Sequence, residues 1–243
     1  MSPTRRRLMV QPVAILLVLG AWTLWRGTTS LDSIEARQLA WSEIGHLAVQ
    51  HLELTVVATL AVLVVAIPVG ILLTRPRFRR ASTAVVGVAN AGQAAPAIGL
   101  VVLLAMWVGF GFKTAVIALA LYALLPVLQN TIVGLNQVDQ TLVEAGRGMG
   151  MSSLAVLFKV ELPLAVPVMA AGIRTALVLL VGTATLATFI NAGGLGGLIV
   201  TGITLFRYPI LVSGALLVAL LALAVDWAGH VMEEILRPKG LSS

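Results

Sequence analysis

The stretch from Glu144 to Pro163, EAGRGMGMSSLAVLFKVELP, decides how this sequence is interpreted, because it interrupts a chain that is otherwise strongly apolar. Of the 243 residues, 59% are hydrophobic and only 11% are charged, and the mean hydropathy is +1.01. A soluble domain needs more charge than this to cover its surface. The composition therefore predicts an all-α, polytopic membrane protein with one domain. The polar, glycine-containing loop inside it needs a separate explanation.

Local signals in and around this stretch predict two short helices joined by a bend. Asp139 is a favourable N-cap, so the first helix is expected to begin at the next residue. Gly148 and Gly150 end that helix, because glycine tolerates the left-handed conformation at a helix terminus. Ser152 caps the second helix, and Pro163 closes it at the first turn of the following span.

The second helix also has an apolar face, since Leu154, Leu157 and Phe158 recur at helical spacing. Arg147 and Lys159 supply charge for a partner protein or for lipid headgroups. These residues alone leave two interpretations equally open. The loop is either a docking surface on the inner face of the membrane or an amphipathic connector that only seats the chain.

Six apolar segments are long enough to cross a hydrocarbon core of about 30 Å. They are about Met9–Trp25, Leu52–Thr74, Ala81–Phe110, Thr114–Leu135, Leu164–Phe189 and Pro209–Val231. The first has no small-residue cleavage site, so we interpret it as an uncleaved signal-anchor helix. The third is too long for one straight helix, and Pro96 is expected to kink or break it. The polar stretch 27–50 predicts a short amphipathic helix on the outer surface.

The predicted organisation has three parts. Residues 1–50 form the signal-anchor helix and the outer amphipathic segment, residues 51–231 form the transmembrane domain with the loop 139–163, and residues 232–243 form a cytoplasmic tail. If the N-terminus is inside, the inner segments contain Arg5, Arg6, Arg7, Arg75, Arg77, Arg79, Arg80, Arg147, Lys159, Arg237 and Lys239. The outer segments contain only Arg26, Arg37, Lys113 and Arg207. This bias predicts that both termini are cytoplasmic, and it explains the net charge of +6 without a nucleic-acid partner.

The loop resembles the cytoplasmic loop of ABC importer permeases, which has the pattern E-A-A-x3-G-x9-I-x-L-P. Seven positions correspond at unchanged spacing: Glu144, Ala145, Gly146, Gly150, Val160, Leu162 and Pro163. Gly146 stands where the family usually has alanine, and Val160 stands where it has isoleucine. Three further stretches resemble the osmoprotectant branch of this family, whose solutes include glycine betaine, choline and carnitine. They are GQAAPAIGL (Gly92–Leu100), ALYALLPVLQNTIVGL (Ala120–Leu135) and GTATLATFINAGGLGGLIVTGI (Gly182–Ile203).

The resemblance covers about residues 51–231 and implies a five-helix type I ABC importer core. It implies that the loop is a coupling helix, which fits a cleft on a cytoplasmic ATPase. The expected protein is a permease subunit in the bacterial cytoplasmic (inner) membrane. Its expected partners are two ATPase subunits, a second identical or different permease, and an extracytoplasmic substrate-binding protein. Two alternatives remain: the same machinery importing methionine, ergothioneine or another small solute, and an ATPase-independent channel or carrier.

The sequence offers no support for enzymatic chemistry in this chain. None of Lys113, Lys159 and Lys239 follows glycine in the frame of a P-loop, so the chain is not its own ATPase by that route. The three histidines lack metal-ligand spacing, and the absence of cysteine excludes thiolate sites. We therefore expect no catalytic residue, no metal and no bound cofactor, and we expect ATP-Mg to be used by the partner ATPase.

Polar and glycine residues in the spans are candidates for a substrate pathway or gate. They are Gln93, Pro96, Asn130, Arg174, Thr183, Asn191, Gly193 and Gly194. Arg174 lies deep in the fifth span, so it is expected to face protein or water, either as a gate or as a paired or snorkelling charge. Each polar side chain could equally bond a neighbouring helix. The glycine-rich segment 193–197, between the fifth and sixth spans, is either an outer gate or a site of close packing. Asp226, in the sixth span, is interpreted as an interfacial structural residue.

Overall fold

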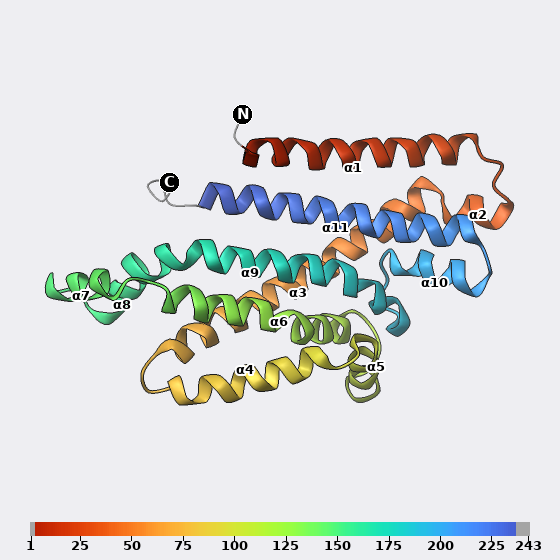
Figure 1. Ribbon diagram of the computed structural model, residues 1–243. Helices are drawn as coiled ribbons and strands as arrows, with labels where there is room; N and C mark the ends of the chain where they lie inside the picture. Colours follow the sequence, from red (N-terminus) through yellow and green to blue (C-terminus); the bar gives the residue numbers. More distant parts are fainter. Residues whose placement is uncertain (1–2, 237–243) are drawn as a thin grey trace.

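The computed structural model describes residues 3–236, with side chains from residue 9 to residue 235, and these residues form helices and turns without a strand (Figure 1). The helices are α1 (Pro3–Thr28), α2 (Ser33–Gln38), α3 (Trp41–Thr74), α4 (Arg79–Ala94), α5 (Ala97–Val108), α6 (Phe112–Asn136), α7 (Gln140–Gly148), α8 (Ser153–Val156), the π-helical turn η1 (Leu157–Glu161), α9 (Leu162–Thr183), the 3-10 helix η2 (Ala184–Ile190), α10 (Gly196–Thr204) and α11 (Tyr208–Leu236). The side chains of Arg5, Arg6, Arg7, Arg237 and Lys239, on which part of the predicted topology rests, lie outside the described residues.

Five helical segments among the described residues are long and apolar enough to cross a membrane. They are Met9–Thr28, Trp41–Thr74, Phe112–Asn136, Ser153–Ile190 and Tyr208–Ile235. Helices α4 and α5 pass the same test together but meet at an angle of 97°, so they form a broken span or a re-entrant hairpin. The predicted break at Pro96 is confirmed. Ala95 before it is extended, with ψ of 145°, because a following proline disfavours the helical conformation.

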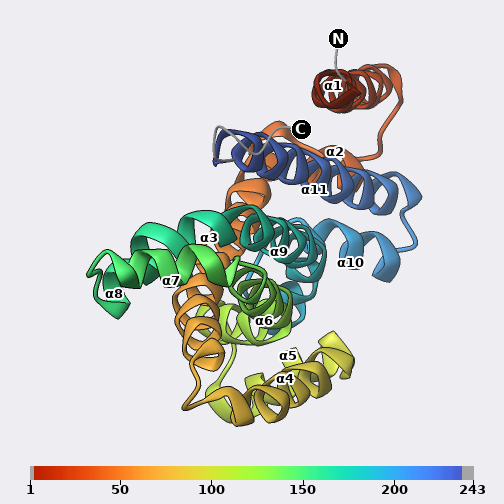
Figure 2. The same ribbon diagram turned by 60° about the vertical axis from the view of Figure 1, so that its left-hand side comes forward.

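The bundle is built around α3, α6 and α9, while α1 lies against α11 and the α4–α5 elbow lies on the other side (Figures 1 and 2). Lipid is as apolar as a leucine side chain, so close packing between spans depends on small residues. A Cβ atom at Gly172 would lie 2.5 Å from the Cβ of Asn130 and 2.7 Å from the carbonyl oxygen of Pro126. Helices α6 and α9 therefore touch almost backbone to backbone at this crossing.

Two predicted boundaries differ from the structure. Helix α3 begins at Trp41 and runs through the predicted boundary between residues 50 and 51, so only the short helix α2 within the stretch 27–50 is separate from it. Helix α11 continues to Leu236, so the tail predicted from residue 232 begins inside it. Hydropathy detects only the apolar part of a helix, whereas a helix continues into water until a breaking residue or a cap ends it.

The first helix is attached to the bundle by polar contacts as well as by apolar packing. The indole nitrogen of Trp22 donates a hydrogen bond of 3.0 Å to the hydroxyl of Ser213 on α11. Gln11, nearer the start of α1, donates to the carbonyl oxygen of Leu223 at 3.0 Å. These contacts at two levels hold α1 along the length of α11.

Candidate functional site

The predicted helix–bend–helix is present at one end of the bundle, where α7 and α8 project beyond the spans (Figure 1). The side chain of Asp139 caps α7 by accepting from the backbone N–H of Thr141 at 2.9 Å, and this bond lowers the pKa of Asp139 below its usual value. Gly150 forms the bend with φ of +82°, in the region where only glycine is unstrained. Ser152 then caps α8 by accepting from the N–H of Ala155. The predicted signals at these three residues are confirmed.

The predicted stop at Pro163 is wrong, because α8, η1 and α9 run on as one continuous helix. In a regular α-helix, the proline ring would clash with the carbonyl group four residues earlier, that of Lys159. The chain avoids this clash with a π-helical turn, in which the N–H of Leu162 bonds to the carbonyl oxygen of Leu157. The short helix α8 is therefore continuous with the span α9.

The seven motif residues divide into an outward-facing group and a packing group. Glu144 and Ala145 on α7, Gly150 at the bend and Pro163 are exposed. Gly146 is buried, and a Cβ atom there would lie 3.5 Å from Val156 and 3.7 Å from Val160. Val160 and Leu162 are half-buried. Gly146 and Val160 thus hold α7 against the second helix, so that Glu144 is presented to the outside.

The hairpin and the π-helical turn that follows it also carry large, exposed apolar side chains. The exposed ones are Leu142, Met149, Leu154 and Phe158, and Phe158 is 64% exposed. Leu157, which was expected on the same face, is buried in the core between the loop and the spans. Exposed apolar side chains near an acidic residue are typical of a protein–protein contact.

An ion pair joins the base of this hairpin to the end of α3. Both carboxylate oxygens of Glu161 accept from the guanidinium group of Arg75, and the Nη1–Oε1 distance is 3.2 Å. Glu161 is buried with 7% of its surface exposed, whereas the Arg75 side chain is 31% exposed. The bidentate geometry holds the start of α9 at a defined position beside α3. Glu161 occupies a variable position of the motif, and the resemblance did not predict its role.

Replacing Arg75 with alanine is expected to lower the free energy of unfolding by about 1–3 kcal/mol, because a buried carboxylate then loses its partner. Thermal unfolding of the purified chain in detergent measures the effect, with Arg77→Ala as a control in the same turn outside the ion pair. Adding Glu161→Leu to Arg75→Ala should recover part of the loss, because no charge then remains buried. Equal effects of Arg75→Ala and Arg77→Ala would contradict a specific role for the pair.

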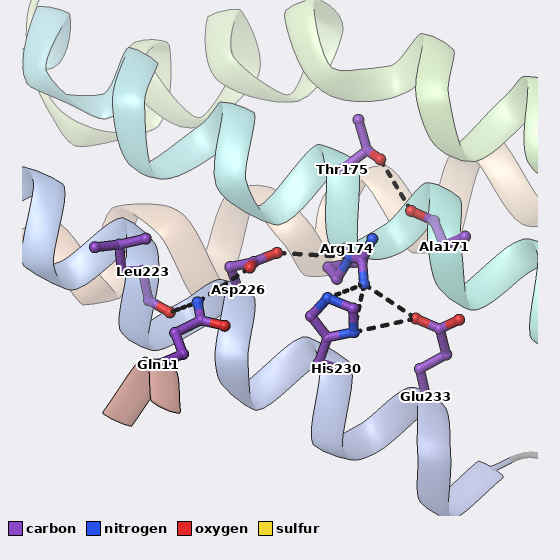
Figure 3. A network of polar contacts seen from close by, with 8 residues as sticks. All are labelled: Gln11, Ala171, Arg174, Thr175, Leu223, Asp226, His230 and Glu233. Atoms are coloured by element: carbon purple, nitrogen blue, oxygen red, sulfur yellow. Dashed lines mark hydrogen bonds and ion pairs between the residues drawn. The ribbon is translucent and has the colours of Figure 1, made fainter. Parts of the chain in front are cut away.

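Arg174 lies at the centre of a polar network between α9 and α11 (Figure 3). Its Nε atom is 3.5 Å from Asp226, and its Nη1 atom is 3.3 Å from Glu233 and 2.6 Å from the ring nitrogens of His230. Gln11 extends the network to α1 by donating to the other oxygen of Asp226 at 3.2 Å. Arg174 is therefore paired with protein groups, in agreement with the expectation that it avoids lipid.

The partners of Arg174 on α11 were only partly predicted from the sequence. Asp226 was interpreted as an interfacial structural residue, whereas in the structure it pairs with Arg174. His230 and Glu233 were not singled out as its partners. Positions 226, 230 and 233 follow the i, i+4, i+7 spacing of one helix face, so a search for polar residues at helical spacing on the last span would have found the group.

A cavity of about 420 Å³ lies beside this network. It is lined by Gln93, Arg174, Thr175, Val178, Leu179 and Asp226. Of the predicted pathway residues, the structure thus brings together Gln93 and Arg174. Asn130 and Thr183 do not line this cavity, and each donates to a carbonyl oxygen four residues earlier in its own helix, at 2.8 Å. Pro96 lies at the elbow between α4 and α5.

The glycine-rich segment lies at the end of the bundle opposite α7 (Figure 1) and is hydrogen-bonded to the first half of α3. Asn191, Gly193 and Gly194 all have positive φ, of 58°, 82° and 92°. The N–H of Gly194 donates to the side-chain oxygen of Gln50 at 3.0 Å, and the nearby His51 ring bonds the carbonyl oxygen of Val181 at 2.9 Å. Gly194 is buried against α3, Gly193 is half-buried, and Asn191 is exposed, so only part of the irregular backbone is enclosed by the protein that the structure describes.

The described chain is thus a bundle of candidate membrane spans with an exposed hairpin at one end and a glycine-rich segment at the other, an arrangement that suits a transport permease. The family model for the inner membrane component of binding-protein-dependent transport systems matches residues 66–237. The chain belongs to this family, and the predicted resemblance to ABC importer permeases is confirmed.

Individual relatives support the same assignment. The chain is 41% identical over 192 residues to the carnitine transport permease protein OpuCB of Listeria monocytogenes, covering 79% of this chain and 87% of that protein. It is 38% identical over 192 residues to the glycine betaine/carnitine/choline transport system permease protein OpuCB of Bacillus subtilis (strain 168), covering 79% and 88%. The fold resembles that in the inward facing MetNI methionine ABC transporter, with a TM-score of 0.70, 24% identity and coverage of 80% of this chain and 96% of that chain.

Proposed function

We propose that this chain is the permease subunit of an ATP-driven importer that moves an osmoprotectant, such as glycine betaine, choline or carnitine, across the bacterial cytoplasmic membrane. The observation that carries the proposal is the docking surface around Glu144, an exposed acidic and apolar patch joined rigidly to a span. The names of its relatives, which are permeases for carnitine, glycine betaine and choline, support this class of solute.

The docking surface would receive a separate ATPase subunit, which binds ATP-Mg and hydrolyses it. Closure of two ATPase subunits would pull two such surfaces together, one on this chain and one on a second permease chain. The continuous helix from α8 through α9 would carry that movement into the bundle, because it lacks a flexible joint. A substrate-binding protein would deliver the solute at the opposite end, beside the glycine-rich segment.

The distribution of charge supports an orientation with both termini and the docking surface in the cytoplasm. Basic residues at the α7 end of the described bundle are Arg75, Arg77, Arg79, Arg80, Arg147 and Lys159. Those at the α10 end are Arg26, Arg37, Lys113 and Arg207. Positive charge is enriched on the cytoplasmic side of membrane proteins.

The proposal is tested by recovering the tagged chain from native membranes and identifying what accompanies it. An ATPase subunit, a second permease chain and a binding protein are expected. Cells lacking the chain should lose uptake of labelled glycine betaine, choline or carnitine, and methionine uptake serves as the matched control. A chain that is recovered alone and moves solute into vesicles without ATP would overturn the proposal in favour of a self-sufficient carrier.

A further inference from the structure

A second polar cavity, of about 470 Å³, lies at the α7 end of the bundle and is not part of the docking surface around Glu144. It is formed where α3 and α6 end and where α4 and α7 begin. The charged residues that line it are Arg75, Arg79, Arg147 and Glu161. Asn136 and Gln140 add polar side chains to its wall.

The cavity carries an excess of positive charge. Glu161 is the single acidic residue among its lining residues, and both of its oxygens are already occupied by Arg75. Arg79 and Arg147 make no ion pair with any residue that the structure describes. Two unneutralised guanidinium groups facing one cavity repel each other, so an anion bound between them would be stabilised.

An anion in this cavity would also stabilise the start of α4. Phe78 stands at the N-cap position and gives no side-chain hydrogen bond, so the first N–H groups of the helix lack a side-chain cap. The first turn contains Arg79 and Arg80 and no acidic residue. Positive charge at the positive end of a 16-residue helix is unfavourable, whereas a phosphate at this position satisfies the N–H groups and offsets both charges.

The position of the cavity indicates where the anion comes from. Thr74 and Asn136, the last residues of two helices long and apolar enough to span a membrane, both line it, so a membrane crossed by these helices would bring its headgroups to the level of the cavity. Basic pockets between spans on the cytoplasmic side of a membrane are suited to anionic headgroups. We propose that this cavity binds the phosphate of an anionic phospholipid through Arg79, Arg147 and the start of α4, with Arg75 held in place by Glu161.

The proposal is tested on the purified full-length chain in a neutral detergent, by native mass spectrometry with added phosphatidylglycerol or phosphatidylcholine. Phosphatidylglycerol is expected to remain bound, whereas phosphatidylcholine is not. Arg79→Gln and Arg147→Gln should each weaken the apparent affinity about fivefold, as expected for one lost basic contact near a headgroup. Arg79→Lys should retain most of the affinity, which separates loss of charge from misfolding.

The matched control is Arg77→Gln, which removes the same charge from the same turn outside the cavity lining. An equal loss of affinity in this control would overturn the proposal, because binding would then follow the general surface charge. Displacement of the lipid by millimolar inorganic phosphate would assign the cavity to a free anion. Displacement by the purified ATPase subunit would assign it to an acidic side chain of that partner.

Discussion

Replacing Glu144 with lysine is expected to reduce ATP-driven uptake of the osmoprotectant more than about tenfold while the chain remains folded in the membrane. Glu144 is exposed on α7 and makes no hydrogen bond or ion pair with the residues that the structure describes. Its removal therefore costs no internal contact. A reversed charge in the centre of the docking surface, however, would oppose binding of the ATPase. Uptake of labelled solute and the amount of ATPase recovered with the tagged chain measure the effect.

A matched control for this variant is Glu234→Lys, the same reversal of charge at an exposed position near the end of α11. It should leave both uptake and ATPase recovery near those of the unmodified chain. If both variants lose uptake equally, the loss arises from the total charge at the α7 end of the bundle and not from Glu144 in particular. If Glu144→Lys transports normally, the hairpin is a connector, and the proposed coupling role is wrong.

Replacing Gly196 with valine is expected to destabilise the chain by about 3 kcal/mol or more, because it overpacks a backbone contact. A Cβ atom at Gly196 would overlap the carbonyl oxygen of Thr185 and lie 2.7 Å from its carbonyl carbon. At the other end of α10, a Cβ atom at Gly202 would lie 2.6 Å from the Cα of Leu211. Helix α10 is thus clamped between η2 and α11 and cannot shift to make room for a larger residue.

The neighbouring glycine provides the control. A Cβ atom at Gly197 would meet only the hydroxyl of Thr188, at an ordinary contact distance of 3.5 Å. The free energy of unfolding of Gly197→Ala is therefore expected to differ from that of the unmodified chain by less than about 1 kcal/mol. Thermal unfolding in detergent and the yield of monodisperse protein compare the two variants. Similar stability of Gly196→Val and Gly197→Ala would show that the glycine-rich segment is adaptable rather than closely packed.

The candidate site could be predicted from the sequence where the signals were local. Asp139 and Ser152 act as caps within three residues of the N–H groups that they accept from, and Gly150 bends the chain at its own position. Pro163 is the exception. Its effect depended on whether the helix before it could widen into a π-turn, and that depends on how the whole segment packs.

The sequence by itself determined the class of this protein, its apolar spans, the break at Pro96 and the hairpin of α7 and α8, because each rests on composition or on residues close together in the chain. Only the tertiary structure decided the pairing of Arg75 with Glu161, 86 residues apart, and of Arg174 with Asp226 on another span. It also decided the 97° elbow and the attachment of Gly194 to Gln50. Such contacts depend on the rotation of each helix about its axis and on the crossing point, which close packing of small residues sets and local patterns do not encode.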